Sequence, residues 1–452
     1  MEQSIKNQSI KNQSIKADTD SRLLIGPNES VSPFQAALLG IQHVLAMDVY
    51  VVPFIIASII GLSAQETSIL IQSTFLAAGI ATIIQSHFCM KLPVGQGPSF
   101  IPIGAIAGIY FANGSGIEGW ASVLGASLIG ALLVVLLSFT GIFTKIIRHF
   151  VPAIVGGTII FIVGLSLMPV ALNNNIFIGE GSSLNQNILL AVFSAFILVA
   201  SVMIASVFPN KGRYIKITSV ILALFGGSLL ANFMGILDLS AVKQASWFSL
   251  MPIPFKDFHF SFNLSATVTM LIIYLVLMAE TTGTWFAVSQ VCDTPLSDEQ
   301  LNRGVLGEGL GCVVSSLLGS TPVTGYSTNA GIISITGVAS RKVLTAAGFW
   351  FILFGFSGKL SALISAIPTA VIGGVFVVVC GIIATSGLQV MKNVAIGERE
   401  MYIIALPMIM TLALTFIPQD YVGSLPQTIQ YLFSSPVATA SLLAIALNKL
   451  LP

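Results

Sequence analysis

Long apolar runs separated by short polar breaks constrain this chain more than any other feature. Examples are VLGASLIGALLVVLLSFTGIF (123–143), ILLAVFSAFILVASVMIASVF (188–208) and MYIIALPMIMTLALTFI (401–417). Each meets or approaches the roughly 18 to 20 residues that a helix needs to cross about 30 Å of hydrocarbon. Only 8% of the residues are charged, against about 25% in soluble proteins. The sequence therefore predicts an all-α polytopic membrane protein.

The breaks divide the chain into fourteen candidate membrane segments. They lie near 34–60, 65–86, 98–111, 119–143, 151–172, 187–208, 216–236, 265–290, 304–320, 328–338, 341–358, 367–391, 401–417 and 427–448. The third and the tenth are too short for a full helical crossing.

The basic residues support this count. With the N-terminus inside, sixteen of the 19 Lys and Arg residues fall on the inner side, and only Lys243, Lys256 and Lys359 fall outside. Positively charged loops stay cytoplasmic. We therefore expect both termini in the cytoplasm, in a multi-pass protein of the inner (plasma) membrane.

Outside the apolar segments the chain offers few signals. Residues 1–32 are polar and carry the repeat QSIKN-QSIKN-QSIKA (3–17), which predicts a disordered tail and not a signal peptide. Cys89, Cys292, Cys312 and Cys380 show no C-x-x-C spacing, so neither disulfides nor a zinc site are indicated. The net charge is +1 and the basic residues are scattered, which argues against a nucleic-acid partner.

The chain also contains a faint internal repeat. PAIVGGTIIFIVG (152–164) and PTAVIGGVFVVVCG (368–381) share a Gly-Gly pair and a further Gly seven positions on. They belong to the fifth and twelfth segments, and the two short segments are also seven apart. Because seven crossings invert the second copy, the pattern predicts a 7+7 inverted repeat, as in many transporters. Chance recurrence of Gly-Gly pairs is the alternative.

The two short segments, GQGPSFIPIG (95–104) and TPVTGYSTNAGIISITG (321–337), then become mates across a pseudo-twofold axis. We expect each to be a short extended stretch leading into a half-helix, since irregular backbone inside a membrane needs protein or a water-filled cavity around it. The helix N-termini would offer N–H donors to a polar ligand. A polar loop that only packs small residues is the alternative.

Acids inside apolar segments are costly, so a functional role is the default hypothesis. Glu280 is the leading ligand or proton site, and Thr284 shares its helix face four residues later. Asp48 in the first segment is either a coupling site or a structural partner. Gln42 and His43, on the same predicted helix, brace the packing or titrate. Glu308 lies near a predicted inner end, where snorkelling, structural and functional roles are equally open.

Several of these motifs together resemble the nucleobase-ascorbate transporter family, which includes bacterial uracil, xanthine and uric acid permeases. The motifs are Gln42-His43, Gly97-Pro98-Ser99-Phe100, Ala279-Glu280-Thr281-Thr282-Gly283, and Thr328-Asn329-Ala330-Gly331 through Thr336-Gly337. The resemblance covers about residues 33–450. It implies a fourteen-segment fold, uptake coupled to H+ or Na+ with no other cofactor, a homodimer and an elevator-like mechanism.

The resemblance also implies a division into domains. Core segments occupy 33–144 and 263–360, gate segments occupy 145–240 and 361–452, and an extracellular loop spans 241–262. The substrate would lie between the third and tenth half-helices.

Carried over by residue, Glu280 would bind a nucleobase, Phe100 would contact its ring, Ser327 and Thr328 would supply polar contacts, and Asn329 would orient them. Four departures leave the particular nucleobase open. Thr328 stands where relatives usually have Glu or Gln, and Thr284 where they often have Asp or His. Tyr50 stands near a position that is small in uracil permeases, where it can stack or narrow the pocket, and Asp48 replaces an apolar residue.

The expected function is therefore symport of a purine, a pyrimidine or a breakdown product. An anion or organic acid carrier of the same inverted fold is the alternative, and it would need Glu280 as a proton site. A passive channel would need a continuous polar pore, which two broken segments with single buried acids do not favour. No metal cluster or nucleophile-base spacing suggests an enzyme.

Overall fold

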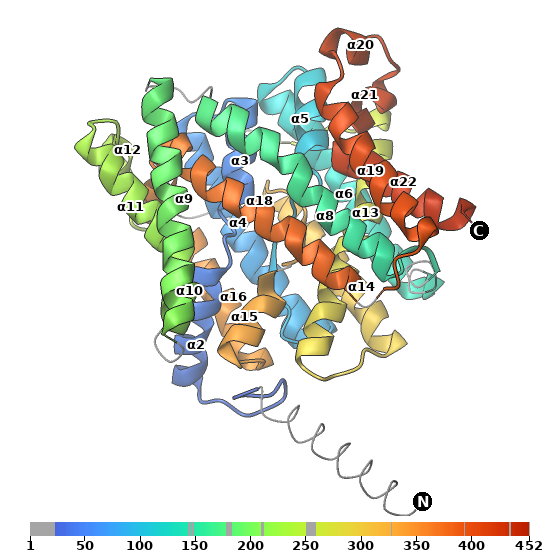
Figure 1. Ribbon diagram of the computed structural model, residues 1–452, viewed down its shortest axis with the longest axis horizontal. Helices are drawn as coiled ribbons and strands as arrows, with labels where there is room; N and C mark the ends of the chain where they lie inside the picture. Colours follow the sequence, from blue (N-terminus) through green and yellow to red (C-terminus); the bar gives the residue numbers. More distant parts are fainter. Residues whose placement is uncertain are drawn as a thin grey trace, which may run out of the picture.

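The computed structural model describes residues 23–142, 145, 149–177, 183–208, 212–249, 259–326, 328–392, 394–433 and 435–451. These residues are mostly helical, as the sequence predicts (Figure 1). Seven of the described helical stretches are long and apolar enough to cross a membrane, or eight if the bent pair α16 and α17 counts as one. The protein is therefore a multi-pass membrane protein.

The elements of the first half begin with α2, at the lower end of the molecule in Figure 1. They are α2 (Pro33–Ala46), α3 (Val51–Ile60), α4 (Ala64–Ile83), the π-helix η1 (Ile84–Cys89), β1 (Gln96–Pro98), α5 (Ile103–Ala112), α6 (Gly116–Thr140), α8 (Ala153–Pro169), the π-helix η2 (Val170–Phe177), α9 (Leu184–Val207), α10 (Gly212–Ile217), α11 (Ser219–Phe233) and α12 (Ser240–Gln244).

The second half repeats the pattern of long helices around one short strand and one short helix. Its elements are α13 (Leu264–Val291), α14 (Asp298–Leu317), β2 (Val323–Gly325), α15 (Thr328–Thr336), α16 (Arg341–Gly355), α17 (Gly358–Ser365), α18 (Thr369–Met391), α19 (Glu398–Phe416), α20 (Gln419–Gly423), α21 (Gln427–Phe433) and α22 (Pro436–Leu450).

The first predicted segment is not the single helix that we expected over 34–60. Helix α2 ends at Ala46, and α3 begins only at Val51. Asp48 and Tyr50 lie in the break, where Asp48 is buried and cannot share a helix with Gln42 and His43. An interrupted helix is tolerated at this depth because the surrounding protein bonds the freed polar groups, here including a hydrogen bond from Tyr326 to Asp48.

The two copies of the Gly-Gly motif lie on helices that pack directly against each other. Helices α8 and α18 lie side by side (Figure 1). The backbone of Gly157 approaches Gly387, whereas Gly164 approaches Cys380 and Ala384. Residues early in α8 therefore meet residues late in α18, so the helices are antiparallel. Glycine at these contacts permits a backbone approach that any side chain would prevent.

The strands β1 and β2 pair antiparallel, with Gln96 opposite Gly325 and Pro98 opposite Val323. Each strand is followed within a few residues by a short helix, α5 after β1 and α15 after β2. The pair is packed against α4, α13 and α14. Two segments more than 200 residues apart in the sequence thus form one small unit inside the helical bundle.

The end of the predicted tail is ordered by backbone bonds. The amide nitrogens of Leu24 and Ile25 donate to the carbonyl oxygen of Gly337 at 2.7 and 3.0 Å, and Ala339 donates back to Ile25 at 2.8 Å. Residues 23–32 therefore belong to the folded protein and not to a disordered tail. The QSIK repeats lie outside the described residues.

Candidate functional site

Glu280 lies in the middle of α13, and its side chain is 7% exposed. Ser99, directly after β1, donates a hydrogen bond from Oγ to Glu280 Oε2 at 2.9 Å. The other carboxylate oxygen has no hydrogen bond from the described residues. The strand unit therefore positions one oxygen of the carboxylate and leaves the other available to a ligand.

Phe100 follows Ser99 and stands at the border of a cavity. Its ring stacks on Phe376 of α18, with centroids 6.0 Å apart and planes 15° from parallel. The cavity, of about 400 Å³, lies between α5 and the ends of α8, α19 and α22. These helix ends lie at the opposite end of the molecule from α2 (Figure 1). The Phe100 ring follows directly after Ser99, which bonds the Glu280 carboxylate. An aromatic ring and a carboxylate can together hold a flat heterocycle by stacking and by N–H bonds.

Thr284 is buried on the same helix as Glu280, one turn further on. Its Oγ1 has no hydrogen-bond partner among the described residues. Its methyl group lies beside Gly325 of β2, where a Cβ atom would be 3.4 Å away. The structure thus places Thr284 next to the strand unit, with an unused hydroxyl.

Asp48 and Tyr50 lie in the break between α2 and α3. Tyr326, directly after β2, donates from its hydroxyl to Asp48 Oδ1 at 3.0 Å. The Tyr326 ring lies against Gly97 of β1, and its amide donates to Gly95 at 2.9 Å. Asp48 therefore supports the strand unit through Tyr326. Tyr50 has a buried hydroxyl without a partner among the described residues, and it lines a separate apolar cavity of about 320 Å³.

Asn329 sits in the first turn of α15 and is buried. Its Nδ2 donates to the carbonyl oxygen of Pro93 at 2.5 Å, which ties α15 to the segment before β1. Its Oδ1 has no partner among the described residues. Thr328 begins α15, but its side chain is not described, and Ser327 lies outside the described residues. The orienting role of Asn329 and the contacts expected of the other two residues remain predictions.

Gln42 and His43 both lie on α2, and His43 is 1% exposed. The carbonyl oxygen of His43 accepts the amide of Met47 at the helix end. Their proposed bracing or titrating roles remain predictions.

Glu308 is fully buried in α14, which excludes the snorkelling role and leaves the structural and functional roles. Its Oε2 accepts Gln85 Nε2 at 3.3 Å and Gln96 Nε2 at 3.0 Å, and its Oε1 accepts the amide of Gly325 at 3.0 Å. The carboxylate therefore holds both strands of the unit to α14. The Gly-rich surroundings in GVLGEGLG were the available signal, because they allow close helix packing.

Ser99, Tyr326 and Phe376 were also missed as contact residues. Ser99 and Tyr326 stand inside the two polar motifs, so their positions were visible but their partners were not. Phe376 follows the Gly-Gly pair of α18, and only the three-dimensional arrangement shows that it meets Phe100.

Comparison with known proteins identifies the family. A family model described as a permease family matches residues 34–420. The uric acid permease PucK of Bacillus subtilis is 33% identical over 434 residues, which cover 93% of this chain and 96% of that protein. A nucleobase transporter of Paenibacillus larvae is also 33% identical, over 91% of this chain and 93% of its own.

Solved structures share the fold at low identity. The transmembrane domain of the cyanobacterial bicarbonate transporter BicA matches with a TM-score of 0.61 at 17% identity, over 86% of this chain and 97% of that one. Murine solute carrier 26 family member A9, an anion transporter in its inward-facing state, matches with a TM-score of 0.59 at 11% identity, over 91% and 67% of the two chains. At these identities the likeness shows the fold alone.

The resemblance seen in the sequence is thus confirmed over most of its length. The chain belongs to the permease family of nucleobase-ascorbate transporters, and it is a transport protein and not an enzyme.

Proposed function

We propose that this protein is a symporter that imports a nucleobase or a related heterocycle, such as a purine, a pyrimidine or a breakdown product. The observation that carries the proposal is the arrangement of Glu280, Ser99 and Phe100. A carboxylate with one free oxygen accepts an N–H group of a heterocycle, and the neighbouring ring stacks on its face. The names of the relatives, which include uric acid and xanthine permeases, support this substrate class.

The movement that we propose is an elevator-like displacement of a core domain against a gate domain. The packing supports this division, because α4, α6, α13, α14 and α16 form one connected set, whereas α8, α9, α11, α18, α19 and α22 form a second, and α13 packs on α8 and α22 where the sets meet. We place the core at 33–144 and 263–360 and the gate at 145–240 and 361–452. Phe100 and Phe376 meet across the boundary, at the border of the cavity.

The 7+7 inverted repeat of fourteen segments follows from the same proposal. The antiparallel contact of α8 and α18 and the matching pairs β1–α5 and β2–α15 support it. Helices α5 and α15, of 10 and 9 residues, would each cross only part of the bilayer. We further place the protein in the inner membrane as a homodimer with cytoplasmic termini.

We propose H+ as the coupling ion, in preference to Na+. Glu280 and Glu308 are the acids of the described bundle that support this choice, because acids buried within membrane segments commonly mark ion pathways. An anion carrier of the same fold is the alternative, in keeping with the anion transporters among the structural matches. A carboxylate at the centre of the site would repel an anion.

Uptake into proteoliposomes tests the proposal. With an inward proton gradient, labelled xanthine or uracil should accumulate, and an unlabelled substrate should compete. Collapse of the gradient with a protonophore should abolish accumulation while exchange persists. Accumulation that needs Na+ and ignores the proton gradient would reject H+ coupling. Uptake of bicarbonate or an organic acid without any nucleobase uptake would favour the anion carrier.

A further inference from the structure

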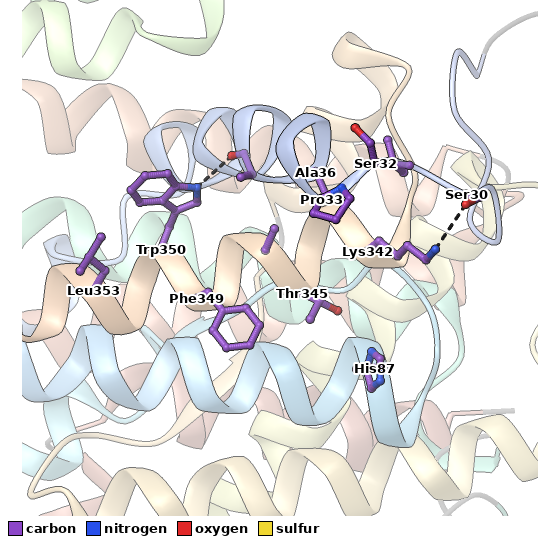
Figure 2. A pocket seen from close by; sticks show the side chains of 13 residues that line it. Ser30, Ser32, Pro33, Ala36, His87, Lys342, Thr345, Phe349, Trp350 and Leu353 are labelled. Atoms are coloured by element: carbon purple, nitrogen blue, oxygen red, sulfur yellow. Dashed lines mark hydrogen bonds between the residues drawn. The ribbon is translucent and has the colours of Figure 1, made fainter.

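A third cavity lies on the flank of the core, and it shares no lining residue with the two cavities described above. It has a volume of about 990 Å³ and runs between α2, α16 and η1 (Figure 2). We call it the α2–α16 groove. It is lined by Ser30, Val31, Ser32, Pro33, Ala36, Ala37, His87, Lys342, Thr345, Ala346, Phe349, Trp350 and Leu353.

The groove has a polar end and an apolar end. Figure 2 shows Ser30, Lys342 and His87 gathered at one end, and Trp350 and Leu353 at the other. The polar end is near the start of α2, at the lower end of the molecule in Figure 1. On α16 the lining positions recur at three- and four-residue intervals, so that one face of this helix forms the whole length of the wall.

The length of the groove matches one leaflet of a bilayer. Lys342 and Leu353 are eleven residues apart on α16, which corresponds to about 16 Å along a helix. Half of the hydrocarbon layer is about 15 Å. If Lys342 stands at the membrane interface, Leu353 lies near the bilayer centre. An acyl chain of one leaflet would therefore fit along the groove from end to end.

The walls of the groove are fixed while its mouth stays open. Trp350 donates from Nε1 to the carbonyl oxygen of Ala37 at 2.9 Å, which holds the indole between the two helices. Phe349 and Leu353 are 62% and 53% exposed. The open side therefore presents apolar surface to the membrane, which is the surface that an acyl chain covers.

The polar end has positive charge without a matching acid. Among the ion pairs of the described residues, none includes Lys342 or His87. Lys342 Nζ donates to Ser30 Oγ at 3.4 Å, and the nearby Glu29 carboxylate lies beside Gly26 instead. Lys342 also stands in the first turn of α16, which holds no acid. The positive end of the helix dipole disfavours a cation there. An anion at this point would therefore offset both the Lys342 charge and the partial positive charge of the helix end.

We propose that the α2–α16 groove binds one anionic glycerophospholipid from the leaflet on the N-terminal side. Its phosphate accepts hydrogen bonds from Lys342, Ser30 and His87, and one acyl chain lies along Phe349 and Leu353. Basic pockets between membrane helices are a recurrent setting for anionic head groups. The site rests on the membrane orientation proposed above, but not on the substrate or its coupling ion.

Lipid binding to the purified full-length protein tests the proposal. Native mass spectrometry and thermal unfolding would compare phosphatidylglycerol with phosphatidylcholine of the same acyl chains, and with glycerol 3-phosphate as a head group without chains. We expect retention and stabilisation by phosphatidylglycerol above both others. Lys342→Gln should weaken phosphatidylglycerol binding about fivefold, the effect of one interfacial lysine. Thr345→Phe should block the chain and lower retention of lipid.

Lys392→Gln is the matched control, because Lys392 is an exposed lysine on the same predicted side but outside the groove. It should bind phosphatidylglycerol like the unchanged protein. Equal binding of the two phospholipids, or equal losses in Lys342→Gln and Lys392→Gln, would overturn the proposal. Full competition by glycerol 3-phosphate would make the ligand a soluble phosphate. Displacement of the lipid by a peptide of residues 3–17 would assign the groove to the N-terminal repeat.

Discussion

Ser99 orients Glu280 through a single hydrogen bond, and the remaining carboxylate oxygen is free of bonds from the described residues. The serine is therefore a positioning residue whose loss leaves the carboxylate in place but less well directed. A hydrogen bond to a charged group contributes about 1.5 to 3 kcal/mol, and a ligand regains part of it. The effect of removing the serine should be smaller than that of removing the acid.

Ser99→Ala should therefore weaken heterocycle binding about fivefold to tenfold, and it should also lower the unfolding temperature of the ligand-free protein, because the buried carboxylate loses its donor. Isothermal titration or a thermal-shift titration would measure it. Ser73→Ala is the control, because Ser73 is equally buried but its hydroxyl bonds only Leu70 of its own helix. Unchanged affinity in Ser99→Ala would show that this bond does not position the ligand site.

Tyr326 and Asp48 form a second buried pair. Tyr326→Phe leaves the Asp48 carboxylate without its donor in a dry environment, which should destabilise the protein by about 1 to 3 kcal/mol. Asp48→Asn keeps an acceptor and should cost less, whereas Asp48→Ala removes the acceptor. A double-mutant cycle of Tyr326→Phe and Asp48→Ala on thermal unfolding measures the coupling between the two residues. Additive effects of the two substitutions would mean that the bond does not hold the α2–α3 break to the strand unit.

At the scale of elements, the sequence identified the two short segments and the Gly-Gly repeat but not the break at Asp48. The glycines and polar residues in GQGPSF and TGYSTNAG indicate an interrupted helix directly from the sequence. The α2–α3 break contains no glycine, and the next proline, Pro53, lies inside α3. The apolar pattern of α2 and α3 therefore resembles that of one continuous helix. Likewise, Glu308 looked peripheral because α14 begins with several charged residues, although its side chain reaches the strand unit.

The antiparallel contact of α8 and α18 gives a prediction about helix packing. Gly164→Ala places a methyl group against the backbone of Cys380 and Ala384, so the helices must separate, and the unfolding temperature should fall. Gly381→Ala on α18 is the control, because its added Cβ would meet nothing within 4 Å. It should be neutral or slightly stabilising. Equal effects of the two substitutions would contradict the close packing of the repeat.

At the scale of the whole molecule, the proposed division into core and gate requires relative motion. The contact of Phe100 with Phe376 joins the two sets of helices, so a bond across it should stop transport. The internal repeat of the sequence could indicate that the helices form two sets. It could not indicate which side chains meet across the boundary, because that depends on how the halves pack.

The test uses a background without native cysteines, into which Phe100→Cys and Phe376→Cys are introduced together. Joining the two cysteines with a short reversible cross-linker should abolish uptake, and reduction should restore it. Phe100 also contacts the site, so uptake of the uncross-linked pair is the reference. The control pair is Ser194→Cys with Val371→Cys, both beside Gly227 within the gate. Its cross-link should leave uptake unchanged. Full uptake by the cross-linked Phe100–Phe376 pair would contradict an elevator movement at this boundary.

The central claim, that Glu280 binds a heterocycle, is tested most directly by ligand binding to the purified protein. Thermal unfolding would be followed with a panel of purines, pyrimidines, allantoin and ascorbate, for the unchanged protein, Glu280→Gln and the exposed-acid control Glu299→Gln. A ligand of the folded state raises its unfolding temperature. We predict a rise with one class of heterocycle that persists in Glu299→Gln and is lost in Glu280→Gln. The same rise in Glu280→Gln, or none with any heterocycle, would contradict the claim.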